Sequence, residues 1–220
     1  MSRAFIAKSL STIVPCIAIL IMLVGCKSSQ TTQIPSLTKV PNMDDGGLLS
    51  ARNSCTPPCF WDIFPGKSTQ VDVERILQSK AVLSKCEAFD NESQGGTRRM
   101  SCEPGLSIVY QKGSDVVDGI GIRPTQIINV ADVINHYGNP DAVLVVLTGT
   151  PDKSPKTTMM LYYDKILTTL VLDEQVGVYY DVQPTTSIFN IGYDDAASYK
   201  AAKQDSATWK GYGKYEQTIH

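Results

Sequence analysis

Few residues in this chain could carry out chemistry. Its 220 residues contain six cysteines and two histidines, His136 and His220. Nucleophilic hydrolysis needs a nucleophile, a base and a group that orients the base, but the sequence has neither a G-x-S-x-G nor an H-E-x-x-H motif. Gly66-Lys67-Ser68 ends like a phosphate-binding loop, but Trp61 stands where such a loop requires its first glycine. No residues have the spacing of metal ligands. We therefore predict no catalytic residue, no metal and no cofactor.

Two adjacent carboxylate pairs, Asp44-Asp45 and Asp194-Asp195, are the remaining acid–base candidates. Neighbouring residues on a strand point to opposite faces, so neither pair suits a catalytic dyad. We expect both pairs at the solvated surface. His136 is expected in the last turn of a helix, where a positive imidazole interacts favourably with the helix dipole. Its predicted role is capping, or simply a place at the surface, rather than catalysis.

Aromatic residues near the two ends of the expected fold offer a different kind of site. A recognition surface could be formed by Phe60, Trp61, Trp209, Tyr212 and Tyr215. The alternative is that these side chains belong to the core and seal the ends of the fold, and we favour that alternative.

The N-terminus predicts export. Arg3 and Lys8 precede an apolar run of 12 residues at 13–24, which is too short for a membrane span of about 20 residues. The run closes with Leu-Val-Gly-Cys at 23–26, which resembles the bacterial lipobox. That resemblance implies cleavage before Cys26 and acylation of its sulfur, for example by palmitate. The alternative is an ordinary secretory signal with an incidental Cys26.

Composition limits the partners. Removal of residues 1–25 with Arg3 and Lys8 would change the net charge from −2 to −4 and leave 195 residues. Nucleic acid is excluded because binding phosphates requires a clustered cationic surface. Nothing in the composition indicates disorder, because 42% of the residues are hydrophobic and 19% are charged.

Export leaves four cysteines for pairing, Cys55, Cys59, Cys86 and Cys102. An even number in an oxidising compartment predicts two disulfides. Three connectivities are open, and we favour nearest with nearest, Cys55–Cys59 and Cys86–Cys102. A redox role for the first pair is disfavoured because three residues separate its cysteines, and a four-cysteine zinc site lacks the C-x₂-C spacing.

Four segments are expected along the chain: a signal peptide at 1–25, a lipidated Cys26 with a flexible tether at 26–52, and two modules at 53–125 and 126–220. The tether is polar and rich in proline and glycine, so it cannot bury enough apolar surface to offset ordering entropy. The fold class predicted is α+β, with two tandem two-layer modules. Each module packs one helix on an antiparallel meander sheet, because neither layer can cover its apolar face alone.

The expected elements follow from capping residues and periodicity. One helix begins after Thr69, with an apolar face of Val73, Ile76, Leu77 and Ala81. The second begins after Asn129 and ends at Gly138. A short helix is expected at 195–203. The expected strands lie at 97–103, 106–111, 115–122, 142–147, 159–163, 166–172, 176–182 and 186–193.

Three segments carry a family resemblance. Residues 55–69 (CTPPCFWDIFPGKST) resemble a C-x-x-P-C-[FW]-x-G-I-x-P-G-x-T segment of uncharacterised bacterial lipoproteins, from which Asp62 departs. Residues 130–140 (VADVINHYGNP) and 209–215 (WKGYGKY) resemble their second helix and their ending. In fold, the chain is similar to BamE/SmpA assembly lipoproteins and to the tandem modules of β-lactamase inhibitor proteins. Those relatives imply non-catalytic protein binding, which is an analogy of fold alone.

We therefore expect an extracytoplasmic lipoprotein on the cell membrane, or on the outer membrane if the cell has one. Its acylated Cys26 would bind the bilayer. Its globular part would bind other macromolecules, such as envelope proteins, or support the envelope, without catalysis. Two alternatives stay open: a hydrolase of envelope polymers with dispersed carboxylates, and a small-ligand binder with a tyrosine-lined pocket.

Overall fold

The computed structural model describes residues 43–50, 54–91, 97–148 and 154–217. The predicted signal peptide, Cys26 and the tether before Met43 lie outside these ranges. So does the stretch 92–96, which belongs to the polar segment NESQGG at 91–96.

Helix α1 (Gln70–Ser79) begins as the sequence predicts. An oxygen of Asp72 accepts a hydrogen bond from the Thr69 N–H at 3.1 Å, and Thr69 Oγ1 accepts one from the Asp72 N–H at 3.4 Å. Val73 and Leu77 are buried, as predicted. The expected burial of Ala81 is wrong, because α1 ends at Ser79 and Ala81 is exposed with a φ of 56°.

Helix α2 (Val130–Tyr137) confirms the second prediction. The Asp132 carboxylate accepts a hydrogen bond from the Asn129 N–H at 3.0 Å. Gly138 ends the helix with a φ of 86°, which a side chain would disfavour. The predicted short helix is α3 (Ala196–Ala202), with Asp195 at its N-cap.

Four strands follow α1, and three of them were predicted. They are β1 (Cys86–Asn91), β2 (Thr97–Cys102), β3 (Leu106–Tyr110) and β4 (Val117–Ile122), with a 3₁₀ turn at Leu83–Lys85 before β1. Strand β1 was missed because its sequence, CEAFDN, shows no apolar alternation. It is a strand because it pairs with β2 from Cys86↔Cys102 to Asn91↔Thr97.

In the second half, β5 and β6 are longer than predicted, and the later strands are shorter or interrupted. They are β5 (Ala142–Thr148), β6 (Lys156–Tyr163), β7 (Thr168–Leu172), β8 (Gln175–Val176), β9 (Tyr179–Val182), β10 (Ile188–Asp194) and β11 (Gly213–Glu216). The predicted strand at 176–182 is broken at Gly177, which has a φ of 129°. A 3₁₀ turn at Asp164–Ile166 replaces the start of the strand predicted at 166.

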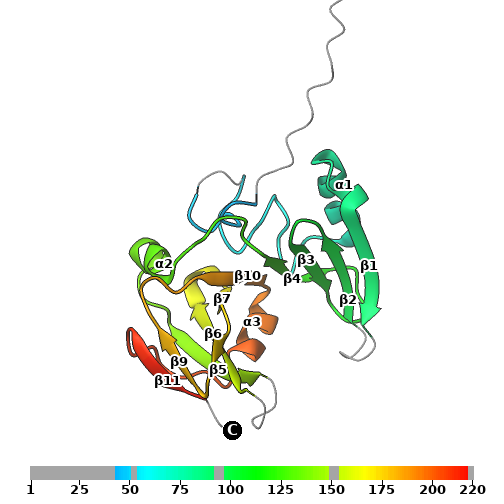
Figure 1. The fold of residues 1–220 in the computed structure, drawn as a ribbon. Helices are drawn as coiled ribbons and strands as arrows, with labels where there is room; N and C mark the ends of the chain where they lie inside the picture. The colour runs from blue at the N-terminus through cyan, green and yellow to red at the C-terminus, as the bar shows by residue number, and fades with distance from the viewer. Residues whose placement is uncertain (1–42, 51–53, 92–96, 149–153, 218–220) are drawn as a thin grey trace, which may run out of the picture. The chain divides into compact units, whose positions relative to one another are not determined.

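The main sheet has nine strands in the order β1-β2-β3-β4-β10-β7-β6-β5, with β8 paired to β6 (Figure 1). Strands β4 and β10 pair antiparallel, with Ile122 opposite Ile191. Because strands from both halves of the chain join there, the meanders form one continuous sheet. Strands β9 and β11 form a separate ribbon. The α+β class is thus confirmed.

Residues 43–50 belong to the folded part, so the expectation of a tether through residue 52 is wrong for this segment. Met43 and Leu48 are 2% and 1% exposed and lie in the main core. The Tyr193 hydroxyl donates a hydrogen bond to the Gly46 carbonyl at 3.0 Å. Gly46 has a φ of 58°, and a Cβ there would lie 2.9 Å from Ile191 Cδ1. Met43 and Leu48 are separated by a turn and form no periodic pattern, so nothing in the sequence indicated that they belong to the core.

Candidate functional site

The sheet has a core face and an open face. On β3, Leu106, Ile108 and Tyr110 are buried, whereas Ser107 and Val109 alternate with them and are only half-buried. The buried side chains join those of α1, α2 and residues 43–50 in the main core. We call the side that carries Ser107 the open face.

A row of small residues crosses the open face. Strand pairing places Ser101 on β2 opposite Ser107, Ser107 opposite Gly121 on β4, and Gly121 opposite Gly192 on β10. Since neighbouring strands lie about 4.8 Å apart, these four residues span about 14 Å. We call them the small-residue row. A Cβ on Gly121 would meet nothing closer than 3.6 Å, so the row lies low between its neighbours.

Aromatic and cationic side chains border the row. Phe89 on β1 is 44% exposed and lies opposite Arg99 in the register of β1 and β2. At the other end, the Arg123 guanidinium lies 4.4 Å from the centre of the Phe189 ring, which is 42% exposed. Arginine and aromatic residues are the types that most often anchor protein interfaces. The open face thus combines a row of small side chains with larger aromatic and arginine side chains at its border.

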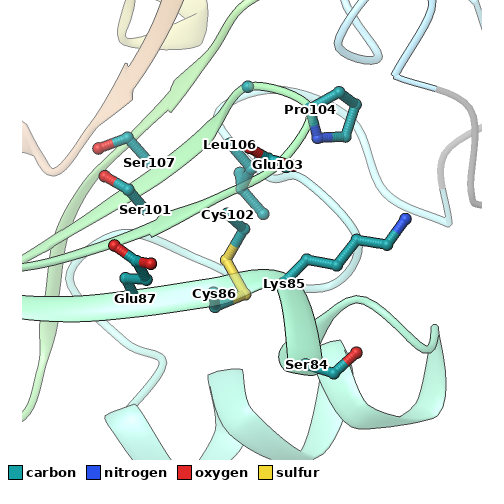
Figure 2. A pocket seen from close by; sticks show the side chains of 11 residues that line it. Ser84, Lys85, Cys86, Glu87, Ser101, Cys102, Glu103, Pro104, Leu106 and Ser107 are labelled. Carbon is teal, nitrogen blue, oxygen red and sulfur yellow. A yellow bond between two sulfur atoms is a disulfide. The ribbon is translucent and has the colours of Figure 1, made fainter.

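A cavity of about 830 Å³ lies at the β1–β3 end of the row. Figure 2 shows Glu87, Ser101 and Ser107 side by side on three neighbouring strands, with the disulfide close by. Its lining also includes Ser84, Lys85, Cys86, Cys102 and residues 103–106. Both of its carboxylates, Glu87 and Glu103, are exposed. A glycosidase-type general acid requires a carboxyl kept protonated by its surroundings, and exposure does not provide this.

The two disulfides pair as the sequence analysis favoured. Cys55 bonds to Cys59 with Cα atoms 5.8 Å apart, and Cys86 bonds to Cys102 with Cα atoms 4.0 Å apart. The second disulfide joins the edge strand β1 to β2. The sulfurs of Cys55 and Cys59 lie within 4.8 Å of a carboxylate oxygen of Asp62. Because the two sulfurs are bonded to each other, they are not thiolate ligands for a metal.

The predicted aromatic surface does not exist as one site. Phe60 and Trp61 are 1% and 5% exposed and stack on each other inside the core. Trp209 stacks on Tyr215 with ring centres 5.8 Å apart, and Tyr215 is 8% exposed. Only Tyr212 among the five is largely exposed, at 43%. The core interpretation that we favoured therefore holds for Phe60, Trp61 and Tyr215, while Trp209 is half-buried.

The prediction that both aspartate pairs lie at the solvated surface is wrong. Asp45 is half-buried and accepts hydrogen bonds from the Gly47 and Leu49 N–H groups. Asp194 ends β10, and Asp195 caps α3 at 9% exposure. Burial raises the pKa of Asp194 to about 6, and the charges of nearby aspartates add to the rise, although a hydrogen bond from Thr169 opposes it. The pair spans a strand end and a helix start, so strand alternation did not apply.

His136 is exposed in the last turn of α2, where the sequence placed it. The residues of the open face were missed as a site. Their only signal was that Ser107 alternates with apolar residues on its strand, which indicates a solvent-facing side but not a function.

Comparison of the chain with protein-family models, with curated proteins and with solved structures finds no match. Within residues 43–217, as far as the structure describes them, no helix has the length and apolar character needed to cross a membrane.

Proposed function

We propose that this chain is a lipoprotein anchored by acylated Cys26 on the extracytoplasmic side of a membrane, where it binds another envelope protein without catalysing a reaction. The lipobox-like residues 23–26 support the anchor. The two disulfides support an oxidising compartment, because such bonds are rare in the reducing cytosol. Two or three acyl chains would hold the protein durably, whereas a single chain would not.

The open face is the observation that supports binding. Its small-residue row allows a partner to approach the sheet closely, and Phe89, Arg99, Arg123 and Phe189 provide anchors at the border. A protein partner suits this combination because the border carries both aromatic and charged groups. A small ligand suits it less, since the cavity beside the row has no aromatic residue in its lining.

The same proposal includes a tandem origin for the two halves. In each half, a helix with an acidic N3 residue precedes an antiparallel meander, and the last strands, β4 and β10, meet antiparallel. Such an arrangement is what two copies of one module, 53–125 and 126–220, would produce when they share a sheet. It agrees with the resemblance to β-lactamase inhibitor modules and to BamE/SmpA lipoproteins, which we retain as part of the proposal.

Site-specific photocrosslinking in intact cells tests the binding surface. A photoreactive amino acid at Ser107 should give a discrete adduct, whereas the same group at Val71, which is 72% exposed on α1, should not. Gly121→Trp would fill the row without a clash at its first carbon and should abolish the adduct. Val71→Trp is the matched surface control and should leave it unchanged. Equal adducts from both positions, or none from Ser107, would contradict the proposal.

A further inference from the structure

Three aspartates meet where β4, β10 and α3 join. Asp194 lies opposite Gly119 in the register of β10 and β4, and a Cβ on that glycine would lie 2.8 Å from Asp194 Oδ1. The N–H of Asp195 donates a hydrogen bond to the carbonyl of Asp118 at 2.9 Å. The start of α3 is thereby attached to β4 through Asp118 and Asp195.

Asp195 uses one carboxylate oxygen to cap α3. Its Oδ1 accepts hydrogen bonds from the Ala197 N–H at 2.7 Å and from the Ser198 N–H at 3.2 Å. Its Oδ2 is buried, and no N–H or O–H group of the described residues donates a hydrogen bond to it. The side chain is 9% exposed, so water cannot easily serve as the donor.

The carboxyl group of Asp118 lies beside that of Asp195, because Ser198 hydrogen-bonds to both. Asp118 Oδ1 accepts a hydrogen bond from Ser198 Oγ at 2.7 Å, and the Ser198 N–H donates one to Asp195 Oδ1 at 3.2 Å. A protonated Asp118 carboxyl would supply the donor that the buried Asp195 Oδ2 lacks, whereas two ionised carboxylates would repel each other. Asp195 already accepts two backbone N–H groups, which favour its anion. The proton therefore belongs on Asp118.

The surroundings support this assignment. Burial raises the pKa of Asp118, and the hydrogen bond to Asp195 raises it further. Burial also disfavours the Asp195 anion, but the hydrogen bonds from Asp118 and from the N–H groups of Ser198 and Ala197 outweigh it and lower its pKa. The residue that approaches Asp195 from the loop before α1 is Gly66, which has no charge.

The charges around this joint are all negative as far as the described residues show. Among the described residues, the only charges that shift the pKa values of Asp118, Asp194 and Asp195 are those of these aspartates themselves. Loss of the shared proton would therefore place three negative charges together in a half-buried region, and the Asp118–Asp195 hydrogen bond would be lost with it.

The rest of α3 is attached elsewhere. Tyr199 is 4% exposed, packs with Ala142 and Tyr162, and donates a hydrogen bond to Asp164 at 2.8 Å. Lys203 pairs with the same aspartate at 2.6 Å. These contacts fix the C-terminal end of the helix, so the aspartate joint decides how firmly its N-terminal end is held. Figure 1 shows α3, in orange, beside β10.

We propose that Asp118 and Asp195 share one proton and form a latch, which holds the N-terminal end of α3 against the sheet while the proton is bound and loosens when it leaves. Tyr162 lies on the open side of β6, opposite Thr169, which in turn lies opposite Gly192 of the small-residue row. A loosened α3 would therefore lengthen the exposed row beyond β10. This last consequence rests on the proposed function, whereas the latch itself does not.

Hydrogen exchange of α3 tests the latch on the full chain in detergent. In Asp118→Asn, the amide can donate to Asp195 Oδ2 at every pH while its oxygen still accepts from Ser198. Protection of the amides at 197–202 should be equal in the native chain and in Asp118→Asn at pH 4. At pH 8 it should be at least about tenfold lower in the native chain, because an ionised Asp118 cannot donate to Asp195 Oδ2 and repels it. Comparing the native chain with Asp118→Asn at the same pH cancels the intrinsic pH dependence of the exchange rate, because it affects both proteins equally.

Two further variants complete the test. Asp118→Ala cannot donate and should leave α3 weakly protected at both pH values. Asp173→Asn, at an exposed aspartate, should behave as the native chain does. If the ratio of protection between the native chain and Asp118→Asn does not change between pH 4 and pH 8, the latch is overturned. Because exchange involves no partner, failure of crosslinking at Ser107 would count against the proposed function and leave this result standing.

Discussion

Replacing Asp194 with asparagine should stabilise the protein at neutral pH. Burial raises the pKa of Asp194 from its ordinary 3.8 to about 6, so the folded chain holds the proton more tightly than the unfolded chain does. Protonation of Asp194 therefore stabilises the folded chain fully below about pH 4. This stabilisation falls as the pH rises through about 6, and at higher pH the free energy of unfolding no longer changes with this group. Asparagine keeps the shape and the acceptor for Thr169 but carries no charge.

The size of the effect follows from the shift. A pKa near 6 in place of 3.8 corresponds to about 3 kcal/mol of unfolding free energy between pH 4 and pH 7. Because Asp194 keeps part of its surface in water, solvent screening reduces this figure. We therefore expect Asp194→Asn to raise the free energy of unfolding by about 2 kcal/mol at pH 7 and by little at pH 4. For a domain of this size, that gain raises the melting temperature by about 4–8 °C.

Urea unfolding at pH 4 and pH 7, with the disulfides intact, measures this difference. Asp173→Asn is the matched control, because that aspartate is exposed and its change should stay within about 0.5 kcal/mol at both pH values. A gain from Asp194→Asn of the same size at both pH values would refute the burial argument, and so would no gain at pH 7.

Three other perturbations test separate features of the chain. Cys26→Ala should move the protein from the membrane fraction to the soluble fraction, and unchanged association would disprove the anchor. Replacing Cys86 and Cys102 together with serine should cost about 3 kcal/mol in urea unfolding, since their disulfide closes a loop of about 15 residues; native stability in the double variant would show that the disulfide is dispensable. Leu48→Ala should cost about 2–5 kcal/mol, whereas Val71→Ala at 72% exposure should cost less than about 0.5 kcal/mol, and equal costs would place Leu48 outside the core.

The elements that could be predicted carry strong local signals. Helix α2 was predicted with its start and its end, because Asn129, the apolar spacing and Gly138 all act within a few residues of one another. Strand β3 was predicted for a similar reason, since Leu106, Ile108 and Tyr110 recur at every second position and a hairpin turn follows them. Strand β1 lacks any such pattern and exists because β2 and a disulfide hold it in place.

The open face could not be predicted. Ser101, Ser107, Gly121 and Gly192 are ordinary residues in the sequence and lie as much as 91 positions apart, and only strand pairing puts them in one row. The sequence also left two positions open for Phe60 and Trp61, a recognition surface or the core that we favoured. Aromatic residues suit a core as well as an interface, and burial alone decides between the two.

Local sequence suffices for the capped helices, because each depends on residues close together along the chain, and the prediction of export has the same local origin. For the cysteines it left three connectivities open, and the structure shows the pairing of nearest with nearest that we favoured. Three other features arise only when distant segments meet in the folded chain: both meanders share one sheet, Met43 and Leu48 are core residues, and Asp118 meets Asp195. The energy of such contacts depends on burial and on which groups face each other, neither of which is encoded by spacing.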